Sequence, residues 1–278
     1  MIHSLVVLLF TTISCSLLGV FLLLRNQSMV TDAISHSVLL GIVGAFFVTR
    51  TIDSPFLVVG AALSGLVAVI LIEKLGSSRF VRKDDAIGII FPLFFSLAII
   101  IISRYLKNAH LDTDCVLLGE VIFASLDTIS VRGVKVARES IKAGIMLIVN
   151  ALFIISFYKE LKISTFDPEL ARTIGMPASF LFYTLMSLAS LTSVMAFNAV
   201  GSIIVISFFI TSAATALLLS KKLFNTLIIA IFFAILNSME GTLLSVHFNV
   251  SMSGMTAFVS MLNFLVISAV AGSKKVRI

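Results

Sequence analysis

The sequence predicts an all-α, polytopic integral membrane protein. Of its 278 residues, 59% are hydrophobic and only 12% are charged, and the mean hydropathy is +1.15. A soluble domain carries about 25% charged and about 45–50% apolar residues. The composition therefore excludes a soluble globular domain, a disordered chain and a nucleic-acid-binding protein. The net charge of +6 fits the lysines and arginines of cytoplasmic loops.

Long apolar runs alternate with short polar breaks along the whole chain. Because a membrane-spanning helix needs about 20 mainly apolar residues, we expect about nine spans. They lie at residues 4–24, 32–49, 55–72, 86–102, 143–157, 179–197, 200–219, 224–244 and 253–271. A weaker segment, 116–126, is too short to cross and is expected to form a re-entrant or interfacial helix.

The orientation follows from the positive charges. With the loop 159–178 in the cytoplasm, thirteen of the 20 lysines and arginines lie inside and seven outside, as the positive-inside rule requires. No Gly-x-x-x-x-Gly-Lys-Ser/Thr loop occurs in the sequence. We therefore expect that the chain does not itself hydrolyse ATP.

The second span carries a carboxylate and an imidazole at helical spacing. Asp32 and His36 are four residues apart, so on a helix they share one face. Oxygen and nitrogen ligands together suit manganese, zinc or ferrous iron better than calcium. The alternative is that Asp32 caps the helix and His36 bonds a neighbouring helix.

The loop 159–178 contains the signature of a short helix. Asp167 can cap it, Pro168 suits its first position, and Glu169 lies in its first turn. Gly175 and Pro177 end it. Such a helix can dock into a groove of a partner protein, or it can be an ordinary interfacial helix.

Two further features of the sequence give weaker evidence of a function. The run 200–216 is rich in small residues, which allow helices to approach closely in lipid. Acidic residues near the outer side could attract cations into an outer vestibule, or they could simply be solvated. These candidates are Asp112, Asp114, Glu120 and Glu240.

Four of these stretches, in order, resemble the membrane permeases of bacterial ATP-binding cassette (ABC) importers for manganese, zinc or iron. Residues 31–41 resemble that family's Gly-Asp-Ala-Ile/Leu-Ser-His signature, and 85–89 resemble the start of its fourth span. Residues 166–177 resemble its Phe-Asp-Pro-Glu-Leu-Ala-Arg coupling loop, and 200–216 its Thr-Pro-Ala-Ala-Thr-Ala span.

Three positions depart from the family pattern. Thr31 replaces the leading glycine of the signature, and Leu40 and Ser212 replace prolines that the family often has. Because proline kinks a helix, we expect both spans to be straighter here. The two ligand candidates themselves are retained.

The resemblance implies one permease domain of residues 1–278 in the bacterial cytoplasmic membrane. It implies a second permease subunit, the same or different, two cytoplasmic ATP-binding subunits and an extracytoplasmic metal-binding protein. ATP hydrolysis in those separate subunits would drive alternating access. Asp32 and His36 would present metal ligands, the metal being cargo and not a bound cofactor. The implied coupling residues are Asp167, Pro168, Glu169, Leu170, Arg172 and Gly175.

Manganese is the favoured cargo, because residues 117–120 with Asp112 and Asp114 resemble subunits of manganese and iron systems more than zinc systems. Zinc or iron import by the same family is the alternative. An iron-siderophore or cobalamin-type permease is disfavoured, because such chains are usually longer and lack the Asp-x-x-x-His signature. An ion-coupled secondary carrier is disfavoured by the loop 167–177.

Overall fold

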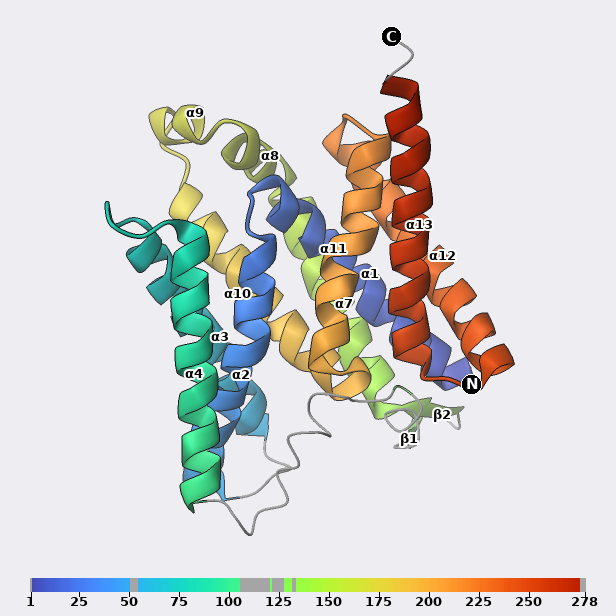
Figure 1. Ribbon diagram of the computed structural model, residues 1–278, viewed down its shortest axis with the longest axis horizontal. Coiled ribbons are helices and arrows are strands. Elements are labelled where there is room, and N and C mark those ends of the chain that lie inside the picture. Colours follow the sequence, from blue (N-terminus) through green and yellow to red (C-terminus); the bar gives the residue numbers. More distant parts are fainter. Residues whose placement is uncertain (1, 51–54, 106–120, 122–127, 132–133, 276–278) are drawn as a thin grey trace.

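The structure is a computed structural model that describes residues 2–50, 55–105, 121, 128–131 and 134–275 (Figure 1). It is a bundle of long helices with a small hairpin at one end. The helices are α1 (Ile2–Leu24), α2 (Ser28–Thr49), α3 (Pro55–Gly76), α4 (Lys83–Tyr105), α7 (Arg138–Ser156), α8 (Tyr158–Phe166), α9 (Pro168–Thr173), α10 (Ala178–Val200), α11 (Ser202–Leu219), α12 (Leu223–Phe248) and α13 (Met252–Lys275).

The predicted membrane spans are present as helices. Eight helices in the described part of the chain are long and apolar enough to cross a bilayer, and α11 adds a shorter apolar stretch, Ile204–Leu219. These nine helices match the nine expected spans, although most extend several residues beyond the predicted ends. α2 is continuous through Leu40, and α11 is continuous through Ser212.

A two-stranded antiparallel hairpin precedes α7 and was not expected from the sequence. It is formed by β1 (Thr128–Val131) and β2 (Val134–Ala137), with Thr128 opposite Ala137. The segment 116–126 is predicted to form a re-entrant or interfacial helix. Apart from residue 121, this segment lies outside the described residues. Hence α7 begins at the hairpin, five residues before the predicted span.

The bundle has two distinct ends (Figure 1). α8, α9 and the C-terminus lie at one end, and the N-terminus and the hairpin lie at the other. The α8–α9 end carries the basic positions that the charge rule assigns to the cytoplasm, such as Lys74, Lys159 and Lys221. We therefore describe this end as cytoplasmic.

α1 is the central helix of the bundle. It packs against α7, α10, α11 and α12, and its Leu8, Leu18 and Phe21 are completely buried. A Cβ placed on Gly19 would overlap the backbone carbonyl of Phe209, so α1 and α11 touch at backbone level. The Thr12 hydroxyl lies 2.8 Å from that of Ser238 in α12, a polar contact of the kind that holds helices together in lipid.

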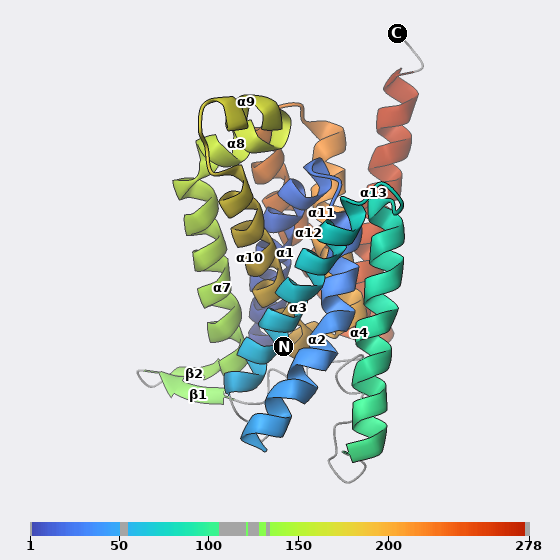
Figure 2. The same cartoon turned by 90° about the vertical axis from the view of Figure 1, so that its left-hand side faces the viewer.

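α2, α3 and α4 form a second packing group beside this centre (Figures 1 and 2). A Cβ on Gly41 of α2 would overlap the carbonyl oxygen of Gly60 in α3, and the Ser64 hydroxyl donates to the Ser37 carbonyl at 2.7 Å. α3 in turn meets α10, where the Ser190 hydroxyl donates to the Ala62 carbonyl at 3.1 Å. These contacts fix the rotation of α2 and with it the candidate site.

Candidate metal site and coupling helices

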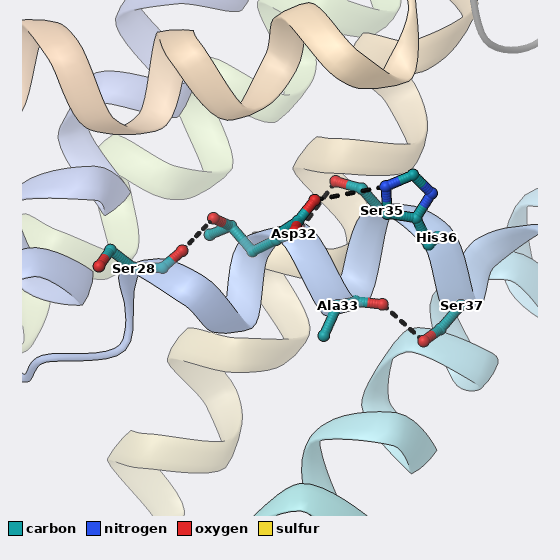
Figure 3. Close-up of polar contacts among 7 residues, drawn as sticks. Ser28, Asp32, Ala33, Ser35, His36 and Ser37 are labelled. Carbon is teal, nitrogen blue, oxygen red and sulfur yellow. Dashed lines mark hydrogen bonds and ion pairs between the residues drawn. The ribbon is translucent and has the colours of Figure 1, made fainter. Parts of the chain in front are cut away.

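Asp32 and His36 face each other on α2, as their spacing predicts. His36 Nε2 lies 3.3 Å from Asp32 Oδ1, and Figure 3 shows the two side chains pointing toward one another. α2 begins at Ser28, with Gln27 as its N-cap residue. The alternative that Asp32 caps this helix is therefore wrong, because Asp32 lies in the second helical turn.

The imidazole of His36 is held by two aromatic rings of α4. Its ring centroid lies 4.6 Å from that of Phe91 and 5.6 Å from that of Phe95, which it meets edge to face. Its Nδ1 is buried and has no hydrogen-bond partner among the residues that the structure describes. A metal-binding histidine usually donates from its second ring nitrogen, whereas this nitrogen is enclosed without a partner in the described part of the chain.

The neighbouring hydroxyl groups of α2 are hydrogen-bonded to backbone carbonyls of their own helix. The Ser35 hydroxyl donates to the Thr31 carbonyl and the Ser37 hydroxyl to the Ala33 carbonyl, each within the same helix (Figure 3). Among the described residues, no three His, Cys, Asp or Glu side chains gather into a metal-binding group. The described part of one chain thus presents two strong ligands at this position.

The pair has the geometry of a two-point metal chelate. An ion about 2.1 Å from each of two ligand atoms that lie 3.3 Å apart would see them at an angle of about 100°, close to both octahedral and tetrahedral angles. The Asp32 side chain is 39% exposed and that of His36 is 19% exposed. An ion could therefore reach the pair while its remaining ligands come from elsewhere.

The predicted short helix of the cytoplasmic loop is present as α9. The Asp167 Oδ1 accepts a hydrogen bond from the Leu170 backbone N–H at 2.9 Å, and Pro168 occupies the first position. Gly175, with φ of +73°, ends the turn in a left-handed conformation that favours glycine. The cap, the first turn and the end of this helix are confirmed.

A second helix, α8, precedes α9, in a segment that the sequence pattern predicts as loop. It is attached to the bundle through completely buried Leu161 and through Arg25, which follows α1. The Arg25 guanidinium donates to the hydroxyls of Ser164 at 2.9 Å and Thr165 at 3.0 Å. Burial lowers the pKa of Arg25 from its ordinary value. α8 and α9 thus form one unit tied to the central helix.

The outward side of this α8–α9 unit is apolar and exposed. Phe166, Leu170 and Ile174 are large hydrophobic residues with more than a third of their surface open. Glu169 and Arg172 are exposed between them, whereas Ala171 is completely buried against the bundle. A protein partner is the usual cover for such a mixed apolar and charged surface.

Of the outer acidic candidates, the described residues include Glu240. It lies on α12 and its Oε2 accepts a hydrogen bond from Asn263 of α13 at 2.8 Å. Asn263 also donates to Asn237, whose amide reaches Ser212 of α11 at 3.3 Å. The chain of amides joins three helices, and a vestibule role for Glu240 stays a prediction. Asp112, Asp114 and Glu120 lie outside the described residues.

This combination of nine apolar helices, a polar pair inside one of them and a capped two-helix unit at the cytoplasmic end defines a membrane transport subunit. The chain belongs to the ABC 3 transport family, whose pattern it matches over residues 1–271. It is accordingly a multi-pass permease of the cytoplasmic membrane and not itself an enzyme.

Individual relatives agree with this assignment. The chain is 39% identical to the manganese transport system membrane protein MntD of Bacillus subtilis over 88% of this chain and 83% of that protein. It is 41% identical to the zinc transport system membrane protein TroD of Treponema pallidum, over 88% and 67% respectively. Its fold is similar to the solved PsaBC from Streptococcus pneumoniae in complex with Fab, with a TM-score of 0.79, 29% identity, and coverage of 96% of this chain and 90% of that one.

Proposed function

We propose that this chain is the permease of an ATP-driven importer for a divalent transition metal, with manganese as the favoured cargo. The observation that carries the proposal is the Asp32–His36 pair, a carboxylate and an imidazole 3.3 Å apart on a membrane helix. Ionisable side chains inside the membrane are costly and line ion pathways by default. The names of the relatives as manganese and zinc transport proteins support the same cargo class.

The pair is half of a coordination shell, which a second permease subunit would complete. Manganese and zinc take four to six ligands, whereas the described part of one chain offers two here. The partial exposure of the Asp32 and His36 side chains leaves room for ligands across a subunit interface. A shell shared between two subunits can also open during transport, because relative motion of the subunits separates the ligands.

The α8–α9 unit is the proposed contact with the ATP-binding subunits. Its exposed Phe166, Leu170 and Ile174 supply an apolar contact. The charges of Glu169 and Arg172 determine how the unit is aligned on the ATP-binding subunit. Arg25 connects this unit to α1, so movement of α8 reaches the centre of the bundle. An extracytoplasmic metal-binding protein would deliver the ion at the opposite end.

The ligand types narrow the range of cargo ions, and the names of the relatives favour manganese over zinc. The ligands are oxygen and nitrogen, with no thiolate in the pair, which suits manganese, iron and zinc rather than copper(I). Several similar proteins carry manganese in their names, whereas one of the two described above carries zinc. A zinc importer is the second candidate, because oxygen and nitrogen ligands serve that ion as well.

The test replaces each ligand by a side chain of similar shape in a strain lacking its other metal importers. We expect Asp32→Asn and His36→Gln each to lower manganese uptake by about tenfold to hundredfold while the permease level in the membrane is unchanged. Ser35→Ala, whose hydroxyl bonds only its own helix, should transport normally. Normal uptake in both ligand variants would refute the site, and uptake of zinc without manganese would assign zinc as the cargo.

A further inference from the structure

An apolar groove opens on the side of the bundle between α7 and α12. Its volume is about 490 Å³, and Leu17 of the central helix α1 contributes to its wall. All the residues that line it are apolar apart from one tyrosine. They are Leu17, Ala151, Ile154, Ile155, Tyr158, Phe224, Leu227, Ile228 and Ile231. Apolar grooves of this size are adequate for a small ligand or one lipid chain.

The groove lies at the depth of the inner leaflet. Its α12 residues, 224–231, start one position after the cytoplasmic end of that helix and cover about 10 Å along its axis. Its α7 residues, 151–155, are the last turns before the cytoplasmic end of α7. Since half of a bilayer core is about 15 Å thick, the groove occupies one leaflet and is aligned with its acyl chains.

Positive charge borders the cytoplasmic end of the groove. Lys159 follows the lining residue Tyr158, and Lys221 and Lys222 come directly before α12, whose Phe224 lines the groove. All three lysines are exposed. The acidic neighbour in these two segments is Glu160, so positive charge dominates. Tyr158 itself lies where aromatic rings sit at the membrane interface.

The groove faces away from the metal ligands. Figure 2 places α7 and α4 on opposite sides of the bundle, and α4 carries the two phenylalanines that hold His36. A second permease that completes the metal shell must approach the Asp32–His36 side. Such an approach, which rests on the proposed function, would leave the groove between α7 and α12 facing lipid.

We propose that this groove is a binding site for an anionic phospholipid of the inner leaflet. One acyl chain lies in the groove, and the phosphate group lies among Lys159, Lys221 and Lys222. Basic clusters at the cytoplasmic side of membrane helices attract anionic headgroups, and the groove supplies the apolar contact that a surface charge alone lacks. The site is independent of the transported metal.

The test measures binding of phosphatidylglycerol and phosphatidylcholine of equal chain length to the purified permease–ATPase complex by native mass spectrometry. We expect the complex to prefer phosphatidylglycerol. Replacing all three lysines by Gln should remove that preference, at roughly fivefold in affinity per lysine. A matched triple variant, Lys74→Gln with Arg79→Gln and Arg82→Gln, removes the same charge from exposed positions near α3 and α4 and should retain it.

A second pair of variants separates the groove from the charges. Ala151→Phe fills the groove and should reduce binding of both lipids, whereas Ile148→Phe, at a 60% exposed position one turn earlier on α7, should reduce neither. Equal losses in the two charge variants would overturn the proposal, as would full lipid binding by Ala151→Phe. Disulfide cross-linking of Ile155→Cys between two copies of the chain would also overturn it, because the groove would then be a protein interface. Because the readout is lipid binding, a failure here leaves the proposed metal transport standing.

Discussion

The close approach of α2 and α3 predicts a sharp difference between two glycines of the same helix. A Cβ on Gly41 would overlap the carbonyl oxygen of Gly60 and lie 2.6 Å from Cβ of Ser64, whereas a Cβ on Gly44 would meet nothing within 4 Å. Neither obstacle at Gly41 can rotate away, because one is backbone and the other is attached directly to backbone. Gly41→Ala therefore requires α2 and α3 to move apart.

The size of the effect follows from these contacts. Carbon atoms pack at about 3.5–4.0 Å, so the 2.6 Å contact requires a separation of about 1 Å. Overpacking of this kind costs about 1–3 kcal/mol. The gain in helix propensity from Gly to Ala, about 1 kcal/mol, is common to both positions and cancels in the comparison. We expect Gly41→Ala to be less stable than Gly44→Ala by about 1–3 kcal/mol.

The same shift should reach the metal ligands. His36 precedes Gly41 on α2 by little more than one turn and is held by rings of α4, so a 1 Å displacement of α2 changes its position against them. Metal affinity falls about tenfold to hundredfold when the support of a ligand is lost, and we expect metal uptake to fall by this factor in Gly41→Ala alone.

Thermal unfolding of the purified permease in detergent and metal uptake in cells measure the two effects. Gly44→Ala is the matched control, since it adds the same methyl group to the same helix. Equal melting temperatures and equal uptake for the two variants would refute the reasoning. Such a result would mean that the tight α2–α3 contact does not position the site.

Three other substitutions test the coupling unit and the outer amide network. Asp167→Ala removes the cap of α9, which costs about 1 kcal/mol, and should weaken copurification of the ATPase. Asp167→Asn retains a capping side chain and should copurify normally. Equal copurification of the two variants would contradict the docking role. Arg25→Gln removes the charged donor to α8, and in reconstituted vesicles metal imported per ATP hydrolysed should fall several-fold; an unchanged ratio would argue against coupling through α1. Asn263→Leu removes the amide donor to Glu240 and should lower the free energy of unfolding by about 1 kcal/mol. Adding Glu240→Gln should partly restore this stability. If Asn263→Leu melts at the same temperature as the parent, the network contributes nothing to stability.

The parts that sequence predicts well are those whose causes are local. A membrane span is defined by its own apolar length, so nine helices are recovered although their ends are not. α9 is defined by Asp167, Pro168 and Gly175 within nine residues, and its cap forms as these residues require. Asp32 and His36 lie one helical turn apart, so their shared face follows from α2 itself.

The parts that sequence misses depend on distant residues. α8 is only nine residues long, and an isolated helix shorter than about 12 residues is marginal in water; it is held by Arg25, more than 130 positions away. The rings of Phe91 and Phe95 around His36 come from α4. The sequence of an apolar run does not indicate which residue of another helix a phenylalanine will contact. The hairpin before α7 does alternate apolar and polar residues, as in Val134-Lys135-Val136, but its strands are only four residues long, so the pattern is too short to stand out among the apolar spans.

The depth of the metal pair constrains its role in transport. Asp32 and His36 lie four and eight residues into α2, about 6 Å and 12 Å from its cytoplasmic end at 1.5 Å per residue. An ion that enters from the outside therefore crosses more than half of a core about 30 Å thick before it meets them. Capture from the proposed metal-binding protein would then use other groups, so Asp32→Asn should lower transport by about tenfold to hundredfold yet leave docking of that protein intact. Loss of docking in this variant would place the pair at the entrance and contradict the depth argument.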